Sequence, residues 1–192
     1  MYQAMTWDYT AHPARCCGPA RHQERFTWDA GGRLAAGRMV DPLRFQLDPL
    51  DAASPNQGPV VPYFFGRRNP LMSADFFAAL QAYGVDNLEA HPVELCEAGD
   101  GKQLPGAWVA VNVVGLLSAA DLEASTIASR RGGREVVFDR MVIDADRARG
   151  ARMFRLAEDP THVWVDAPLR TQLASAGFTH LRFWRPTQVA SL

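Results

Sequence analysis

The sequence contains a single lysine, three cysteines and no long apolar segment. No stretch approaches the ~18 consecutive apolar residues that a membrane-spanning helix needs. Residues 1–15 also lack the basic start and apolar centre of a secretory signal peptide. An odd number of cysteines makes a poor disulfide framework. We therefore expect a cytoplasmic protein with reduced thiols and no membrane partner.

Charge of one sign is not in excess either. Twenty basic and 21 acidic residues leave a formal net charge of -1, whereas nucleic-acid binders usually display a concentrated basic face. Apart from Lys102 every basic residue is arginine, and the arginine clusters are interspersed with acids. A nucleic-acid-associated module that uses these arginines therefore stays only as a weak alternative.

The composition is that of a folded globular chain. Hydrophobic residues make up 47% of the 192 residues and charged residues 21%, far from the values of disordered proteins. This length suits one domain that buries most of its apolar surface. We expect residues 1–70, rich in Pro and Gly, to form a loop-rich segment packed on the core, and residues 71–192 to form the main α+β domain.

Two segments carry complete helix signals. Ser73 is a good N-cap, Phe76 and Leu80 recur at helical spacing, and Gly84 ends the pattern. Residues 166–177 repeat this logic, with Asp166 as the cap, Leu169, Leu173 and Ala176 as the buried stripe, and Gly177 at the end. The spacing predicts two helices of equal length. Either the helix-glycine-strand unit is duplicated or two such units arose by chance.

The other periodic segments predict strands. Residues 85–96 are extended, and Pro92 argues for an edge strand or a bulge there. Residues 106–117 are apolar at nearly every position, which is typical of a central strand covered on both faces. Further strands are expected at residues 134–144, 153–156, 162–165 and 178–184. We predict an α+β single domain with two main helices on a mixed or largely antiparallel sheet.

Motifs for catalysis are absent from the sequence. There is no Gly-x-Ser-x-Gly nucleophile elbow and no Walker phosphate loop, and the five histidines stand apart from one another. We expect no catalytic residue and no cofactor. The rival hypothesis is a small hydrolase-like enzyme in which His162 or His180 meets two acids in a deep pocket.

One segment has the residue types of a zinc site. His12, Cys16, Cys17 and His22 are all possible zinc ligands. Adjacent cysteines rarely both reach one tetrahedral ion, and the usual Cys-x-x-Cys spacing is missing. We therefore predict no metal and treat these four residues as weak candidates.

Acidic residues gather between residues 86 and 100. Five acids occur there without a Lys or Arg among them: Asp86, Glu89, Glu94, Glu97 and Asp100. A solvated face is one interpretation of this pattern. The other is a docking surface, because concentrated like charge steers a basic partner and raises its association rate.

The order of segments resembles a known family. The resemblance rests on "GVDNLEAHPV" from Gly84, on "VNV" at 111–113 followed by Asp121, Leu122 and Ser125, and on "FRL" at 154–156 before the last helix and strand. In this order and spacing the sequence is similar to the immunity-protein family numbered eleventh among those of bacterial polymorphic toxin systems. The resemblance covers residues 71 to 184.

This resemblance implies a function. Immunity proteins are non-enzymatic inhibitors that are encoded beside a secreted toxin and bind it tightly in the cytoplasm of the producing cell. It therefore implies a cognate toxin domain as the partner, neutralised by occlusion. We expect the five acids to form the electrostatic rim of the toxin-binding surface, with Trp108 or Trp184 as an anchor only if one of them is exposed. Residues 1–70 match the family loosely and are a candidate partner-specific element.

Overall fold

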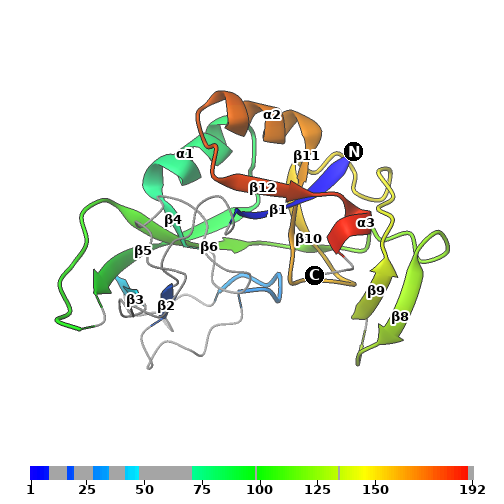
Figure 1. Cartoon of the computed structure of the whole chain (residues 1–192), viewed down its shortest axis with the longest axis horizontal. Helices are drawn as coiled ribbons and strands as arrows, with labels where there is room; N and C mark the ends of the chain where they lie inside the picture. Colours follow the sequence, from blue (N-terminus) through cyan, green and yellow to red (C-terminus); the bar gives the residue numbers. More distant parts are fainter. Residues whose placement is uncertain are drawn as a thin grey trace.

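The computed structural model describes residues 1–8, 17–19, 28–34, 42–47, 71–97, 99–133 and 135–189. It is an α+β single domain, as predicted (Figure 1). The elements in chain order are β1 (Tyr2–Trp7), β2 (Cys17–Pro19), β3 (Leu43–Leu47), β4 (Leu71–Ser73), α1 (Ala74–Ala82), β5 (Leu88–Glu97), β6 (Trp108–Val113), β7 (Leu116–Leu117), β8 (Thr126–Arg130), β9 (Val136–Arg140), β10 (Met153–Leu156), β11 (Val163–Asp166), α2 (Ala167–Ser175), β12 (Leu181–Trp184) and α3 (Pro186–Val189).

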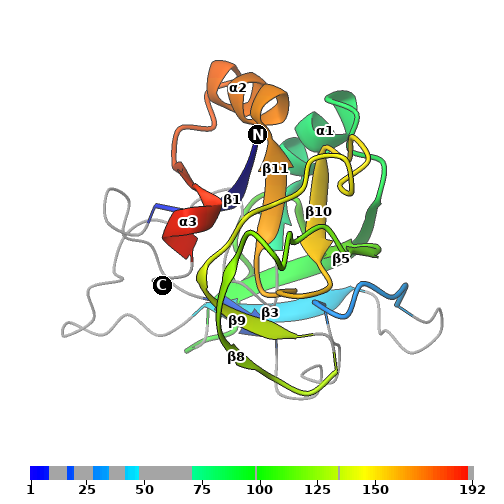
Figure 2. The ribbon, with the colours of Figure 1, turned by 90° about the vertical axis from the view of Figure 1, so that its right-hand side faces the viewer.

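The strands form two larger sheets and a hairpin. One sheet has the order β12-β1-β11-β10-β7 and the other the order β2-β3-β5-β6-β4, while β8 and β9 pair only with each other among the described strands. The helices α1 and α2 lie side by side on one side of the molecule in both views (Figures 1 and 2). The β8–β9 hairpin projects at the opposite end of the molecule from β2 and β3 (Figure 1).

The two predicted helix units have the same topology. Strands β4 and β5 flank β6, which is antiparallel to both, and α1 connects them. Strands β11 and β12 flank β1 in the same way, and α2 connects them. Ser73 and Asp166 cap the helices, and Gly84 and Gly177 follow them at φ +84° and +86°. Each glycine therefore has the left-handed conformation that costs other residues free energy.

The helices share one core. Phe76 and Leu80 of α1 and Leu169 and Leu173 of α2 are buried in the same apolar cluster. The rings of Phe76 and Phe178 pack in a T-shaped arrangement with their centroids 4.9 Å apart. Each pair is spaced four residues apart, so it occupies one face of its helix. Ala176, predicted in the stripe of α2, is exposed. That prediction was wrong because Ala176 is the C-cap, where the helix already turns away from the core.

The N-terminal segment contributes strands to both sheets. Strand β1 lies between β11 and β12, and β3 pairs with β5. The large apolar side chains of Trp7, Trp28 and Phe45 are buried in the same apolar cluster as the helices. Phe26 and residues 63–65 lie outside the described residues. The division of the chain at residue 70 remains a proposal.

Strand β5 is not an edge strand, contrary to the expectation from Pro92. It lies between β3 and β6. Val114 N donates to Asn87 O at 2.8 Å, and hydrogen-bonded pairs of an antiparallel ladder recur at every second residue. Pro92 therefore occupies a position whose backbone nitrogen points away from β6. The ladder to β3 begins only at Val93, so the missing N–H leaves no partner unsatisfied.

The remaining strand predictions hold, with one division. Residues 106–117 were expected to form one strand but form β6 and β7, which belong to different sheets. Gly115, at φ +93°, turns the chain between them. Strands β10 and β11 pair antiparallel as neighbours, and β9 pairs antiparallel with β8. The chain therefore passes from one sheet to the other at Gly115.

Candidate functional site

The five acids of the predicted docking surface do not form one patch. They extend along β5, whose ten residues span roughly 30 Å, and into the turn after it. Asp86 precedes the strand and Asp100 follows it, and both are exposed. Glu89, Glu94 and Glu97 lie within the strand and are half-buried. Because side chains alternate along a strand, Glu89 and Glu94 point to opposite faces.

Glu89 belongs to an internal network. Its Oε2 accepts hydrogen bonds from Leu34 N and from Asn112 Nδ2, both at 3.0 Å, and Asn112 also donates to Gly32 O at 2.8 Å. Burial by itself raises the pKa of Glu89. The hydrogen bonds from Leu34 and Asn112, with the charges of His91 and Arg33, outweigh burial, and the net pKa is lowered. Glu89 therefore ties residues 28–34 to the sheet.

The other three acids have different partners, and an ion pair neutralises Glu94. Glu94 Oε2 lies 2.8 Å from Nε of Arg44, its direct neighbour across the β3–β5 ladder. At the far end, Asp100 Oδ1 accepts from Lys102 N at 2.9 Å and shapes the turn after β5. Glu97 N donates to Lys102 O in the same turn. The exposed acidic charge therefore lies at the two ends of β5, on Asp86 and Asp100.

Several residues of the sequence motifs hold the fold together. Asn87 Nδ2 donates to Val114 O at 3.3 Å and to Met153 O at 3.0 Å, which joins the two sheets. Ser125 Oγ accepts from Val142 N at 2.9 Å. Asp121 Oδ1 accepts from two backbone N–H groups of the turn that follows it. These motif residues have structural partners, so they are poor candidates for contacting another molecule.

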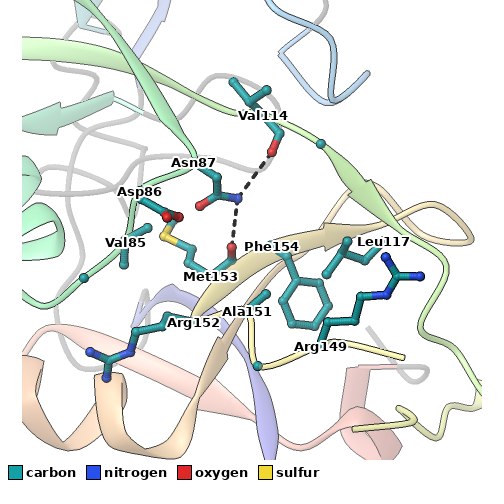
Figure 3. A pocket seen from close by; sticks show the side chains of 13 residues that line it. Val85, Asp86, Asn87, Val114, Leu117, Arg149, Ala151, Arg152, Met153 and Phe154 are labelled. Atoms are coloured by element: carbon teal, nitrogen blue, oxygen red, sulfur yellow. Dashed lines mark hydrogen bonds between the residues drawn. The ribbon is translucent and has the colours of Figure 1, made fainter. Parts of the chain in front are cut away.

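A cavity of about 420 Å³ opens where the two sheets meet. Three loops form it: the one after α1, the β6–β7 connection, and the one before β10 (Figure 3). Its lining residues are Gly84, Val85, Asp86, Asn87, Val114, Gly115, Leu117, Arg149, Gly150, Ala151, Arg152, Met153 and Phe154. No sequence pattern predicts this cavity, because its walls are far apart in the chain. The one local signal was the glycine in each loop.

Arg152 fixes one wall of the cavity. Its Nε lies 3.2 Å from Asp166 Oδ2, its Nη2 donates to Gln172 Oε1 at 2.8 Å, and its Nη1 donates to Tyr83 O. Tyr83 is the C-cap of α1, and Asp166 is the N-cap of α2. Arg152 thereby joins the two helices and is committed to that role.

The histidines named in the enzyme hypothesis do not line this cavity. His162 Nδ1 donates to Asp159 Oδ2 at 2.6 Å, and Thr161 Oγ1 donates to Asp159 Oδ1, all within the β10–β11 turn. Burial by itself raises the pKa of Asp159, but the hydrogen bonds and charge of His162 and the hydrogen bonds of Thr161 lower it overall. His180 accepts from Asp8 N through its backbone oxygen.

Arg155 is buried beneath the same turn. Its Nη1 donates to Pro160 O at 2.7 Å and to Thr161 O at 3.3 Å. Burial lowers the pKa of Arg155 to about 10, against the opposing effect of Asp29 and Asp159. Arg155 and His162 therefore act together to hold the β10–β11 connection in place. This connection is a structural turn.

The weak zinc candidates lie mostly outside the described residues. His12, Cys16 and His22 are not described, and only the backbone of Cys17 is, in β2. In the part of the chain that the structure describes, no group of three or more His, Cys, Asp or Glu side chains is placed to hold a metal ion.

The two tryptophans considered as anchors differ in exposure. Trp108 is 8% exposed, and its Nε1 donates to Pro105 O at 3.3 Å, so it belongs to the core. Trp184 is half-buried, with the guanidinium of Arg182 3.8 Å from its ring centre. Arg182 covers one face of this ring, which is the geometry of a cation–π contact.

Comparison with known proteins identifies the family of this chain. A search of curated proteins finds no similar sequence. None of the helices in the described ranges has the length and hydropathy of a membrane span. The immunity protein family (Imm11) matches residues 12–187, which includes much of the N-terminal segment as well as the region that carries the sequence motifs. Because the match covers most of the chain, this protein is a member of the immunity protein family Imm11.

Proposed function

We propose that this protein neutralises a cognate secreted toxin by binding it and covering its active site or a nearby surface. The observation that supports this function is the family match over residues 12–187. Occlusion requires no reaction by the immunity protein itself. The hydrogen-bonded roles of His162, Asp159 and Glu89 inside the fold agree with a protein that acts by binding. The proposed place of action is the cytoplasm of the toxin-producing cell.

The proposed electrostatic rim consists of the five acids, in two roles. Asp86 and Asp100 are exposed and carry the charge that steers a basic partner surface. Glu94 and Glu97 lie between them, with Glu94 sharing its charge with Arg44. Glu89 attaches residues 28–34 to β5 through the hydrogen bond from Leu34 N. Residues 1–70 remain the proposed partner-specific element.

Co-expression with the toxin encoded by the neighbouring gene tests the function. Growth of cells that express the toxin domain alone should stop, and growth should be restored when this protein is made with it. Killing that persists despite good expression of this protein would refute the proposal. Affinity capture from the native cell should bring down the C-terminal domain of one large secreted protein.

The stoichiometry of inhibition tests the mechanism. A protein that acts by occlusion inhibits one toxin molecule for each molecule of immunity protein. The activity of the toxin should therefore fall linearly as immunity protein is added and reach zero near a 1:1 molar ratio. Inhibition that is complete at a small fraction of that ratio would instead indicate turnover by this protein and would support the enzyme hypothesis.

A further inference from the structure

Arg149 has an unusual backbone conformation. Its φ is +52°, and every other described residue with positive φ is a glycine, including its neighbour Gly150 at +73°. A side chain with a Cβ is strained in this region. A glycine at position 149 would avoid the strain, so the arginine side chain is retained at a cost in stability.

The loop around Arg149 enforces this conformation. Asp144 Oδ1 accepts from Asp146 N and Arg147 N, and Ala148 N donates to Asp144 O. Ala148 itself is fully buried. Arg149 N donates to Asp146 O at 3.1 Å and Ala151 N donates to Ala148 O at 3.0 Å, so hydrogen bonds restrain the backbone on both sides of Arg149. Such strain persists only where the surrounding structure imposes it, and it is concentrated at functional sites.

The strained arginine has no structural partner for its side chain within the described residues. Its side chain is exposed, and no ion pair or hydrogen bond joins it to another described side chain. In contrast, Arg152, three residues later, is bonded to both helices. Neither packing nor a salt bridge in the described fold therefore accounts for an arginine at position 149.

Arg149 stands at the cavity between the sheets. Figure 3 shows Arg149 and Asp86 on opposite sides of the lining residues, with Phe154, Met153 and Leu117 between them. The cavity volume of about 420 Å³ is within the range of pockets that accept a ligand or an anchoring side chain.

We propose that this cavity is a docking site for a loop of the toxin that carries a carboxylate side chain, and that Arg149 binds this carboxylate. The proposal rests on the proposed function. The planar guanidinium pairs with a carboxylate through two parallel hydrogen bonds. Asp86, which also lines the cavity, attracts the basic surface around this loop and repels the carboxylate of the loop, so the carboxylate is placed at Arg149. The rigid backbone at Arg149 reduces the entropy that is lost on binding.

Arg149→Gly separates binding from stability. The variant relieves the backbone strain, so the full chain without partner should unfold about 2–4 °C higher than wild type. The same variant should bind a catalytically inactive toxin domain roughly 10-fold to 100-fold more weakly, as expected when a hydrogen-bonded charge is lost. Unchanged affinity, or a lower unfolding temperature, overturns the proposal. A residue with only a structural role would not show these opposite effects.

Arg131→Gly is the matched control. Arg131 is also exposed, it lies outside the cavity at the base of the β8–β9 turn, and it has no positive φ. This control removes the same charge and should leave affinity within about twofold of wild type, because exposed charges away from the contact contribute little. Equal losses in the two variants would attribute the effect to net charge and overturn the proposal.

Filling the cavity tests the site without changing charge. Val114→Trp places a large side chain at the half-buried wall, and Val137→Trp, in the hairpin, is its control. Only Val114→Trp should weaken toxin binding, by at least 10-fold. If it binds as tightly as wild type, the cavity is not occupied. If Val114→Trp fails to fold, the Arg149→Gly and Arg131→Gly pair still decides.

Two further outcomes separate this inference from its alternatives. Wild-type protein that does not bind the toxin domain at all refutes the proposed function, whereas tight binding that is indifferent to Arg149 refutes only the docking site. The alternative is a phosphate-binding site. It would be identified, and the proposal overturned, if immobilised RNA at moderate salt retains wild type but not Arg149→Gly while both bind the toxin equally.

Discussion

The Nε of Arg152 lies 3.2 Å from Oδ2 of Asp166, the residue whose Oδ1 caps α2 by accepting from Leu169 N at 2.6 Å. The other end of the same guanidinium donates to the carbonyl of Tyr83 at the end of α1. One side chain thereby connects the two helix units. Loss of the Arg152 guanidinium would leave Tyr83 O, Asp166 and Gln172 without this partner. The cost is substantial because the Arg152–Asp166 pair is mostly shielded from water.

Arg152→Met should lower the free energy of unfolding by roughly 2–4 kcal/mol, since it keeps the apolar stem and removes only the polar contacts. Urea denaturation measures the change. Arg147→Met provides the control, because the Arg147–Asp144 pair is more exposed and should contribute about 0.5 kcal/mol or less. Equal effects of the two variants would contradict a linking role for Arg152.

Gly84→Ala and Gly177→Ala should have nearly equal effects, of about 1 kcal/mol each, because both positions have φ near +85° at the same place in equivalent units. The double variant should show the sum of the two costs. Gly132→Ala, in open space at an ordinary φ, should change stability by less than about 0.5 kcal/mol. Thermal unfolding distinguishes these cases.

Stability should depend on Asp159 at acidic pH. The folded protein lowers the pKa of this carboxyl below its ordinary value of about 3.9, so the unfolded chain binds the proton more readily. The contribution of Asp159 is then fully present above about pH 4 and is lost as pH falls through the lowered pKa. Asp159→Asn should be less stable than wild type at pH 7, and the difference should narrow toward pH 3.

Urea midpoints measured from pH 7 to pH 3 check this dependence. Thr161→Val removes one hydrogen bond to Asp159 and keeps the carboxylate, so its difference from wild type should narrow less. A difference between Asp159→Asn and wild type that stays constant over the whole pH range would show that the carboxylate's charge is not involved.

Glu89→Ala should destabilise the fold by roughly 2–3 kcal/mol, because it leaves the Leu34 N–H without its acceptor and removes one of the two acceptors of the buried Asn112 amide. Glu89→Gln retains an acceptor oxygen and should recover part of this loss. Chemical denaturation gives both values. If Glu89→Ala is as stable as wild type but binds the toxin domain more slowly, Glu89 acts through its charge on the partner and not by holding the fold.

Asp86→Asn combined with Asp100→Asn should slow association with the toxin domain several-fold at low salt and change stability little. The difference from wild type should disappear as salt rises toward 0.5 M. The control is Asp139→Asn with Glu123→Gln, which changes net charge equally at exposed positions outside the cavity. Stopped-flow association rates that match between the two double variants would exclude steering by the rim.

Local sequence signals predicted the two main helices, but they could not predict which distant strands pair with each other. The caps at Ser73 and Asp166 and the glycines after each helix act within a few residues, so the sequence shows them directly. Proline is usually found in edge strands or at bulges, but β5 accommodates Pro92 between two strands because β3 pairs with it only from Val93 onward. This starting point cannot be inferred from the residues around Pro92. The pairing of β1 with β11 and β12 could not be predicted from any local pattern.

The candidate site shows the same division. The acids between residues 86 and 100 are close in sequence, but strand alternation and the hydrogen bonds of Glu89 distribute them over two faces. The cavity depends on three loops that meet only in the folded chain. The strain at Arg149 is a property of backbone angles, and "RARG" gives no sign of it beyond the adjacent glycine.

The pairing of β1 with β11 and β12 determines when this sheet can form during synthesis. Tyr2 pairs with Asp166, so β1 leaves the ribosome about 160 residues before its partners exist. At roughly 5–20 residues per second, translation imposes a wait of about ten to thirty seconds. Until then this five-stranded sheet lacks β11, its middle strand, and β12, its edge strand beside β1. The nascent chain therefore cannot complete this sheet before residues 163–184 have been made, and any activity that needs the whole sheet begins only after synthesis is nearly finished.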